Sequence, residues 1–188
     1  MAGEHTPMSM AHHVRWGAPS LWLAGLSLSG LVSLAWAALG DVTPYLVYNP
    51  TDSIAPGWYR LQPLRPPLPP LSVGSVVLVS PPVEAAMLAA QRGYLPARVP
   101  LLKPIGAMAP QQVCVTADTV RINGVVVARV LRADRLGRPL SAWPSCRRLY
   151  PGEVFLLSTT NPASFDSRYF GPVPMASVRG AAQPLLTR

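Results

Sequence analysis

The sequence predicts a mainly β protein in which an N-terminal transmembrane helix precedes an exported, β-rich domain of antiparallel sheets. Three observations lead to this fold class. Residues 16–40 form an apolar run without a charged side chain. Short runs rich in β-branched residues recur after it, separated by Gly, Pro, Asp and Asn. The chain also holds 23 prolines, which favour loops and irregular strands over long regular elements.

The membrane helix is the first predicted element. Leu21–Leu39 reads LWLAGLSLSGLVSLAWAAL, close to the roughly 20 mostly apolar residues that span a bilayer. Trp22 and Trp36 lie near its ends, where amphipathic rings favour the interface. Ala35-Trp-Ala37 resembles a signal-peptide cleavage site, but the apolar run exceeds the roughly 7–15 residues of a signal-peptide core. We therefore predict a cytoplasmic tail at 1–18 and a retained anchor at 19–40.

The flanking charges predict how the chain is oriented. Arg15 precedes the apolar run and Asp41 follows it, so the positive-inside rule places the N-terminus in the cytoplasm. The predicted location is the inner (cytoplasmic) membrane, with residues 41–188 as a domain in the periplasm. The whole chain carries 16 basic and 8 acidic side chains. Outside the membrane, such a surface suits anionic lipid headgroups or simply a solvated positive face, and nucleic acid is not an expected partner.

Five runs predict strands in the exported domain, because they concentrate β-branched residues between turn formers. These runs are Val76–Val79, Val113–Thr116, Val120–Ile122, Val125–Val127 and Val154–Leu157. Asn123-Gly124 between two of them is the strongest short hairpin signal. Val83–Arg92 holds strong helix formers and ends at Gly93, so we predict one helix there.

The residues missing from the exported domain exclude several kinds of active site. All three histidines, His5, His12 and His13, precede the membrane segment. Catalysis by Ser-His-Asp or Cys-His groups and histidine metal sites are therefore excluded from residues 41–188. Cys114 and Cys146 are too few for a zinc site, but an exported domain permits a disulfide between them. We expect no metal and no cofactor.

Lys103 is the sole lysine among the 16 basic residues and lies in the apolar run Val99–Ile105. In a strand, alternate residues share a face, so Val99, Leu101 and Ile105 would point the same way as the lysine. Burial lowers the pKa of a lysine, and a neutral amine is a general base that arginine cannot replace. The alternatives are a lysine left by codon bias and one whose head reaches water. The two prolines of this run predict an edge strand or an irregular one.

Ser53 is the candidate nucleophile for such a base. It lies in the turn-rich stretch Tyr48–Tyr59, the kind of loop that can present a hydroxyl beside hydrogen-bond donors. The alternative is an ordinary turn serine. Ser53 follows Leu39 by 14 residues, so it would lie within about 50 Å of the end of the predicted membrane helix.

At these positions the chain resembles the bacterial type I signal peptidases, family S26. The segment from Asn49 to Gly57, Asn-Pro-Thr-Asp-Ser-Ile-Ala-Pro-Gly, resembles their Ser-x-x-Pro nucleophile box, including the hydroxyl residue Thr51 two positions before the serine. Gly74–Val79 resembles the strand box of these enzymes, and Lys103–Gly106 resembles their lysine box. Val120–Gly124 resembles the strand and hairpin that follow the lysine box, and Ser164–Gly171 resembles the final Ser-x-Asp-Ser-Arg-Tyr box. The resemblance therefore covers nearly the whole chain.

The TraF-type branch, which serves conjugative transfer, is the most similar part of the family. The similarity lies in Asn-Pro-Thr-x-Ser, Gly-Trp-Tyr and Ser-Phe-Asp-Ser-Arg-Tyr-Phe-Gly-Pro-Val. It implies a signal-peptidase-like fold, related to LexA-like Ser/Lys enzymes, and a membrane-anchored serine endopeptidase that cleaves or cyclises an exported conjugative pilin. Two departures are Ile54, where the general enzymes usually have methionine, and Met108–Gln112, which replaces their usual Pro-Gly-Asp turn.

The resemblance also implies the role of each site residue. Neutral Lys103 would take the proton of Ser53, which attacks a peptide carbonyl and forms an acyl-enzyme. The N–H of Ser53 and the hydroxyl of Thr51 would stabilise the oxyanion. Three residues of the final box would support this site, the first by orienting the amine and the other two by pairing with each other: Ser164, Asp166 and Arg168. In the TraF-type branch, Asp166 would act more directly.

The implied partners are a membrane-bound precursor protein, the lipid of the inner membrane and the type IV secretion or conjugation apparatus. Two alternative functions remain. One is a general signal peptidase I. The other is a membrane-anchored scaffold of a pilus or secretion apparatus, without chemistry, which accounts for the anchor, the basic surface and the proline-rich loops. A scaffold does not account for the sole lysine aligning with a Ser-x-x-Pro loop in a domain that lacks histidine.

Overall fold

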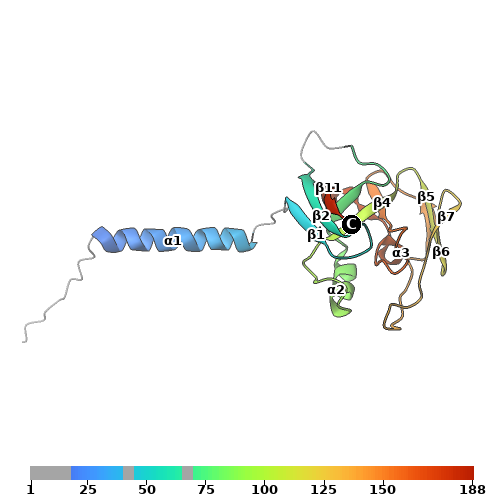
Figure 1. Cartoon of the computed structure of the whole chain (residues 1–188), viewed down its shortest axis with the longest axis horizontal. Helices are drawn as coiled ribbons and strands as arrows, with labels where there is room; N and C mark the ends of the chain where they lie inside the picture. The colour runs from blue at the N-terminus through green and yellow to red at the C-terminus, as the bar shows by residue number, and fades with distance from the viewer. Residues whose placement is uncertain (1–17, 40–44, 65–69) are drawn as a thin grey trace, which may run out of the picture. The chain divides into compact units, whose positions relative to one another are not determined.

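The computed structural model describes residues 18–39, 45–64 and 70–188, shown in Figure 1. The helix α1, Ala18–Leu39, belongs to one compact unit and the β-rich domain to a second, Thr43–Arg188. Residues 1–17 of the predicted cytoplasmic tail, together with Asp41, lie outside the described residues. None of the helices that the structure describes has both the length and the apolarity required for crossing a membrane, so the predicted anchor stays a prediction.

The described part of the domain folds into two antiparallel sheets, which confirms the mainly β, antiparallel prediction. In spatial order, the seven-stranded sheet of the described residues consists of β1 (Leu46–Asn49), β2 (Gly57–Pro63), β11 (Val178–Thr187), β3 (Val76–Val79), β4 (Leu101–Met108), β9 (Glu153–Leu156) and β10 (Val173–Pro174). In the same order, the four-stranded sheet consists of β7 (Val125–Arg129), β6 (Thr119–Ile122), β5 (Gln112–Val115) and β8 (Cys146–Arg148). Within the domain, Figure 1 shows β5, β6 and β7 at the end opposite β1 and β2.

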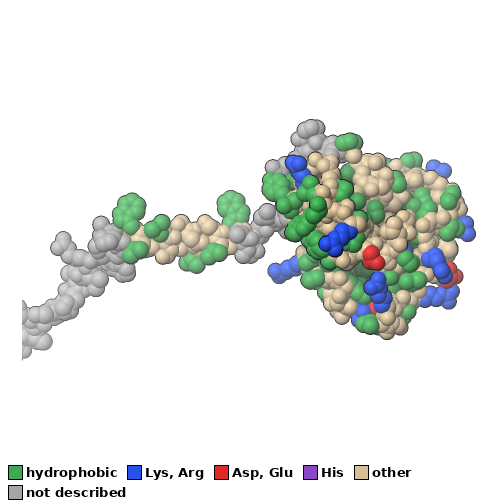
Figure 2. Space-filling model, viewed as in Figure 1, with side chains coloured by type: hydrophobic (Ala, Val, Ile, Leu, Met, Phe, Trp, Pro, Cys, Tyr) green, Lys and Arg blue, Asp and Glu red, His purple; other side chains and the backbone are tan. Residues whose placement is uncertain are grey.

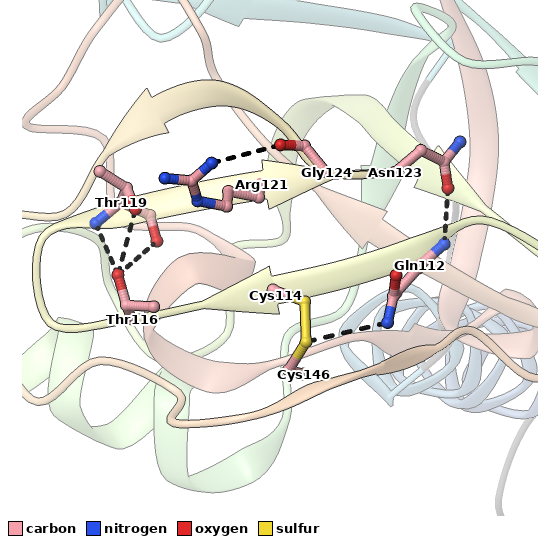
Figure 3. The surroundings of a disulfide bond; sticks show 8 residues. All are labelled: Gln112, Cys114, Thr116, Thr119, Arg121, Asn123, Gly124 and Cys146. Carbon is pink, nitrogen blue, oxygen red and sulfur yellow. Dashed lines mark hydrogen bonds between the residues drawn. A yellow bond between two sulfur atoms is a disulfide. The ribbon is translucent and has the colours of Figure 1, made fainter.

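The five predicted strand runs and the predicted helix coincide with β3, β5, β6, β7, β9 and α2 (Val83–Gln91) to within one or two residues, whereas β1, β2, β8, β10 and β11 were not predicted. Asn123 and Gly124 have φ values of 48° and 83°, the positive angles of the hairpin turn that joins β6 to β7. The Asn123 side chain also accepts a hydrogen bond from the N–H of Gln112 at 2.9 Å, visible in Figure 3. The predicted helix is α2 (Val83–Gln91), and Gly93 adopts the positive φ that commonly ends a helix.

Two short helical elements complete the described part of the domain, α3 (Ser167–Phe170) and the 3-10 turn Met175–Ser177. Both belong to the C-terminal segment that leads from β9 to β11. The turn of α3 lies within the final sequence box, so it brings that box back beside β9.

The strand β4 carries Lys103 through the middle of the larger sheet, between β3 and β9. The edge position that its prolines suggested is therefore wrong, but the predicted irregularity is present as a register shift after Ile105. Pro104 donates no hydrogen bond, and its carbonyl accepts one from the Leu157 N–H at 3.1 Å. A Cβ at Gly106 would lie 2.5 Å from the Leu157 Cβ. The glycine of the lysine box is thus required for β9 to pack closely on β4.

Burial alternates along β4 as the sequence predicts. Leu101, Lys103 and Ile105 are buried, whereas Val99 precedes the strand and is 41% exposed. Ile105 packs in an apolar cluster with residues of β3 and β9. Lys103 therefore lies on an apolar strand face, where its burial restricts the conformations of its side chain.

A disulfide bond links two neighbouring strands of the smaller sheet. Cys114 on β5 and Cys146 on β8 form a disulfide across directly paired positions, as Figure 3 shows. The two cysteines are 32 residues apart, so the bond ties the long connection after β7 to the sheet. In Figure 2, basic side chains spread over the viewed face of the domain with few carboxylates among them.

Candidate active site

The structure brings together three side chains from distant parts of the sequence. The Lys103 Nζ donates to the Ser53 Oγ and to the Ser164 Oγ, each at 2.7 Å. All three side chains are buried, and 6% of Lys103 is exposed. Ser53 lies in the loop between β1 and β2, Lys103 in β4, and Ser164 in the segment between β9 and α3. The three side chains therefore form one line of hydrogen bonds, which is the arrangement expected of a nucleophile, a base and a group that orients the base.

Burial determines the protonation of Lys103. The pKa of the Lys103 amine is lowered from 10.5 to about 8, chiefly by desolvation and to a smaller extent by the Arg168 guanidinium. The carboxylates of Asp166 and Asp52 act in the opposite direction, because a nearby negative charge favours the ammonium. The net result is an amine of which an appreciable fraction is neutral near pH 8.

The loop that carries Ser53 is built around the buried side chain of Asn49 at the end of β1. The Asn49 amide donates to the carbonyls of Thr51, Ile54 and Ala55 at 2.6, 3.2 and 3.3 Å. Its Oδ1 accepts hydrogen bonds from the Thr51 N–H and hydroxyl at 3.2 and 2.8 Å. The sequence analysis missed this residue, although it opens the Asn-Pro-Thr motif and asparagine is typical of such turns.

Asp166 and Arg168 form an ion pair that is fully buried, with both side chains 0% exposed. The guanidinium makes a two-point contact with the carboxylate, at 2.7 Å from Nε to Oδ1 and 3.0 Å from Nη2 to Oδ2. Arg168 also donates to the carbonyls of Arg129, Pro162 and Ser158. The pair therefore joins three separate stretches of chain, and its effect on Lys103 is through charge.

Ser158, two residues after the end of β9, is a second residue that the sequence analysis missed. Its hydroxyl donates to the carbonyl oxygen of Ser53 at 2.6 Å, and its N–H donates to the Asp166 Oδ2 at 3.0 Å. It lies in a run of small polar residues with no pattern that distinguishes it from a surface turn. Only the folded chain places it against the nucleophile loop.

A cleft of about 830 Å³ opens beside the three side chains, and Ser53, Lys103 and Ser164 line it. Leu95, Leu101 and Leu131 contribute apolar wall, which suits an extended peptide with small or apolar side chains. Asp52 also lines this cleft and accepts a hydrogen bond from the Asn161 amide at 2.8 Å.

One part of the cleft wall is held together by the carboxylate of Asp134. The Tyr94 hydroxyl and the Arg138 Nε donate to its Oδ2, at 2.5 and 2.6 Å, and the Arg92 Nη1 lies 3.9 Å away. Burial alone would raise the pKa of Asp134, but the hydrogen bonds from Tyr94 and Arg138 lower it well below its usual range. The Tyr94 ring also contacts Phe165, the neighbour of Ser164, at 5.5 Å between centroids. This wall is thus joined to the site itself.

The two departures from the signal-peptidase boxes leave the site geometry intact. Ile54 packs against the apolar cluster that contains Tyr59 and Leu61, so it fills core space beside the nucleophile. The turn after β4 is closed by Gln111, whose N–H donates to the Met108 carbonyl at 2.9 Å. Because β4 runs on to Met108, this turn begins beyond the lysine box. Among the described residues, no group of His, Cys, Asp or Glu side chains is arranged to hold a metal.

One family model and several known proteins are similar to this chain in sequence. Residues 20–186 match the family described as signal peptidase, peptidase S26. The chain is 32% identical to a plasmid transfer protein TraF of Escherichia coli, covering 87% of this chain and 94% of the relative. It is 35% identical to a probable conjugal transfer protein TraF of Sinorhizobium fredii, covering 85% and 89%, and 33% identical to a conjugal transfer protein TraF of Agrobacterium fabrum, covering 86% and 93%. A crystal structure of a signal peptidase I from Enterococcus faecalis aligns with a TM-score of 0.36 and 23% identity, over 60% of this chain and 97% of that one.

Proposed function

Because the chain belongs to the signal peptidase family, peptidase S26, we propose that it is a serine endopeptidase with Ser53 as nucleophile and Lys103 as general base. One observation carries this proposal. The amine of the buried Lys103 contacts the Ser53 hydroxyl at 2.7 Å, which is within the reach that proton transfer needs. A scaffold without chemistry gives no reason for burying an ammonium beside a hydroxyl, since burial of a charge destabilises the fold.

The reaction follows from this contact. The neutral Lys103 amine takes the proton of the Ser53 hydroxyl while Oγ attacks the substrate carbonyl, which forms a tetrahedral intermediate. The resulting ammonium then gives its proton to the leaving amine as the peptide bond breaks, so an acyl-enzyme and the neutral base remain. Water, activated by the same amine, hydrolyses the ester. An amine of the substrate that arrives first would instead form a new peptide bond and close a ring.

The oxyanion would be stabilised by the Ser53 N–H and the Thr51 hydroxyl, each worth about 3–4 kcal/mol in comparable enzymes. The Thr51 Oγ1 lies 3.3 Å from the Ser53 Oγ, which is close enough to reach an oxygen that forms beside it. In the free protein this hydroxyl donates to the Asn49 Oδ1 at 2.8 Å. It must therefore turn toward the substrate when the intermediate forms.

Ser164 would orient the base, because its hydroxyl accepts the second hydrogen bond of the Lys103 amine. When an N–H of the neutral amine donates to Ser164, the nitrogen lone pair can point at the Ser53 hydroxyl and accept its proton. Asp166 and Arg168 would hold the segment that bears Ser164, and the carboxylate of Asp166 would also tune the lysine pKa.

We infer a role in conjugative transfer from the TraF relatives, whose names describe plasmid or conjugal transfer proteins. The substrate would be an exported, membrane-bound precursor, most simply the conjugative pilin, and the partners would be the conjugation apparatus and inner-membrane lipid. Residues 19–40 would anchor the enzyme, with its catalytic domain, 41–188, in the periplasm. Membrane fractionation and protease accessibility of whole cells and spheroplasts test this placement.

Mass spectrometry of the pilin tests the proposed reaction. The candidate pilin is expressed with the wild type, with Ser53→Ala, with Lys103→Arg, and with the control Ser177→Ala, which removes an exposed hydroxyl that only caps the Pro174 carbonyl. We expect processing by the wild type and the control and none by the other two. Unchanged processing by both site variants would refute the dyad. A product lighter than the linear peptide by one water would establish cyclisation.

A further inference from the structure

The nucleophile loop is held by a hydroxyl that belongs to neither the proposed dyad nor its known boxes. The Ser158 Oγ donates to the carbonyl oxygen of Ser53 at 2.6 Å, across 105 residues of sequence. Ser158 is 1% exposed, so water does not compete for this contact. A short hydrogen bond in a dry surrounding restricts the Ser53 backbone more than one at the surface.

Both backbone groups of Ser158 are fixed by the buried ion pair. Its N–H donates to the Asp166 Oδ2 at 3.0 Å, and its carbonyl accepts from the Arg168 Nη2 at 2.5 Å. The carboxylate and the guanidinium are in turn bound to each other. Ser158 therefore cannot move without breaking charge-assisted hydrogen bonds, which are the stronger kind.

The surroundings of the Ser158 hydroxyl also set its direction. The Asn161 N–H donates to the Ser158 Oγ at 3.2 Å, which occupies a lone pair of this oxygen. The Thr160 hydroxyl lies 3.3 Å away, farther than the Ser53 carbonyl. The single proton of Ser158 is therefore directed at Ser53, and the hydroxyl acts as a donor with a fixed orientation.

We propose that Ser158 is a positioning residue, which transmits the rigidity of the Asp166–Arg168 pair to Ser53. This inference rests on the proposed function. The contact holds the Ser53 carbonyl, and thereby restricts the backbone at the Ser53 Cα from which the nucleophilic Oγ projects. Asn49 holds the same loop from the β1 side. Ser158 makes no hydrogen bond to Lys103 in the described structure, so it acts on the geometry of the nucleophile and leaves the protonation of the base unaltered.

This arrangement predicts a specific kinetic effect for Ser158→Ala. Loss of the hydroxyl lets the Ser53 backbone relax, and a misplacement of about 1 Å at a reacting group can lower the rate roughly 100-fold. We expect kcat to fall by about 10- to 100-fold, with KM unchanged and the midpoint of the rising limb of the pH profile unchanged. A variant that is merely less stable would lose active enzyme in proportion to its unfolded fraction, which near-UV circular dichroism measures.

The experiment uses the full-length protein and a fluorogenic peptide that spans the point at which the wild type cleaves the pilin. Ser177→Ala is the matched control and should keep wild-type kcat. A second pair, Ser158→Thr and Ser158→Val, adds nearly equal volume to the buried position, but only threonine retains the hydroxyl. Per folded molecule, we expect the threonine variant to be about 10-fold faster than the valine variant or more.

The outcomes separate the two proposals. If Ser53→Ala still cleaves the peptide, the proposed function is wrong. If Ser53→Ala is inactive while Ser158→Ala is as fast as the wild type, or while the threonine and valine variants are equally fast, only the positioning role of Ser158 is wrong. A shift of the pH midpoint in Ser158→Ala would also contradict it, because the hydroxyl would then act on Lys103.

Discussion

Lys103 and Ser53 are 50 residues apart in the sequence, and their Nζ and Oγ atoms lie 2.7 Å apart in the fold. The contact joins a central strand of the larger sheet to the loop between β1 and β2. Both side chains are buried. Ser164 accepts a hydrogen bond from the lysine amine, and the Asn49 side chain donates hydrogen bonds to the loop that carries Ser53. Because the surroundings of this pair disfavour charge, they affect the pKa of Lys103, and both activity and stability should depend on it.

The pH dependence of peptide cleavage should follow the Lys103 amine. Burial lowers its pKa to about 8, and only the neutral form accepts the proton of Ser53, so the rate should rise with pH and reach half its maximum near pH 8. Steady-state kinetics between pH 6 and 10 measure this limb. Lys103→Arg keeps the positive charge and should be inactive throughout; measurable activity in it would contradict the role of the lysine.

Asp52→Asn should move this limb to lower pH. The Asp52 carboxylate raises the pKa of Lys103, and asparagine removes the charge while it can still bond to Asn161. Because Asp52 is exposed, the displacement should shrink as salt is added. Asp118→Asn, in which the changed carboxylate is an exposed partner of Arg132, is the control and should leave the profile unchanged. A displacement to higher pH would contradict this prediction.

Lys103→Met should stabilise the fold at neutral pH while it abolishes activity. At pH 7 the lysine is protonated in the folded and the unfolded chain, but its folded pKa is lower, about 8 against 10.5, so the buried ammonium destabilises the native state. Removing it should increase the free energy of unfolding by about 1–3 kcal/mol at pH 7. The gain should diminish as pH rises from 8 toward 10.5, because the wild-type lysine then loses its proton in the folded state while the unfolded chain still holds it. Urea unfolding at pH 7 and pH 10 provides the comparison.

Arg168→Met should be among the most destabilising substitutions in the domain. It leaves the Asp166 carboxylate buried without its partner, which costs about 3–5 kcal/mol in comparable buried pairs. Arg132→Met is the matched control, because the Arg132–Asp118 pair is exposed, with 74% and 68% of the two side chains accessible. It should cost less than about 1 kcal/mol. Equal losses in urea unfolding would mean that the buried pair has no special structural role.

Reduction of the disulfide should lower stability without altering the chemistry. Cys114 and Cys146 close a loop across 32 residues, for which chain entropy predicts a stabilisation of about 3–4 kcal/mol. The double variant Cys114→Ala/Cys146→Ala should show this loss in thermal unfolding. Its kcat at a temperature where it is fully folded should equal that of the wild type, because Lys103 belongs to the larger sheet and Ser53 to a loop between two strands of that sheet. A large decrease in kcat would indicate that the smaller sheet supports the site directly.

Several strands and one hairpin can be predicted from the sequence, because the patterns that indicate them involve only neighbouring residues. Strand runs such as Val76–Val79 and the Asn123-Gly124 hairpin depend on neighbouring residues, so single segments predict them. The family boxes identify Ser53 and Lys103 in the same way, since each box is a short, contiguous pattern. The edge position suggested for β4 was wrong because proline propensity is also local. The bulge after Ile105 and the fit of Gly106 against Leu157 allow Pro104 in a central strand.

The sequence alone determined which residue types were available: one lysine, no histidine after residue 13, and a serine in an Asn-Pro-Thr-x-Ser loop. Only the tertiary structure decided which groups meet. Ser158 reaches Ser53 across 105 residues, and Ser164 reaches Lys103 across 61. Such contacts depend on the order of strands in the sheet, which no local pattern encodes. Burial, which lowers the lysine pKa, is likewise a property of the assembled fold, and it makes neutral an appreciable fraction of an amine that would be a cation in water.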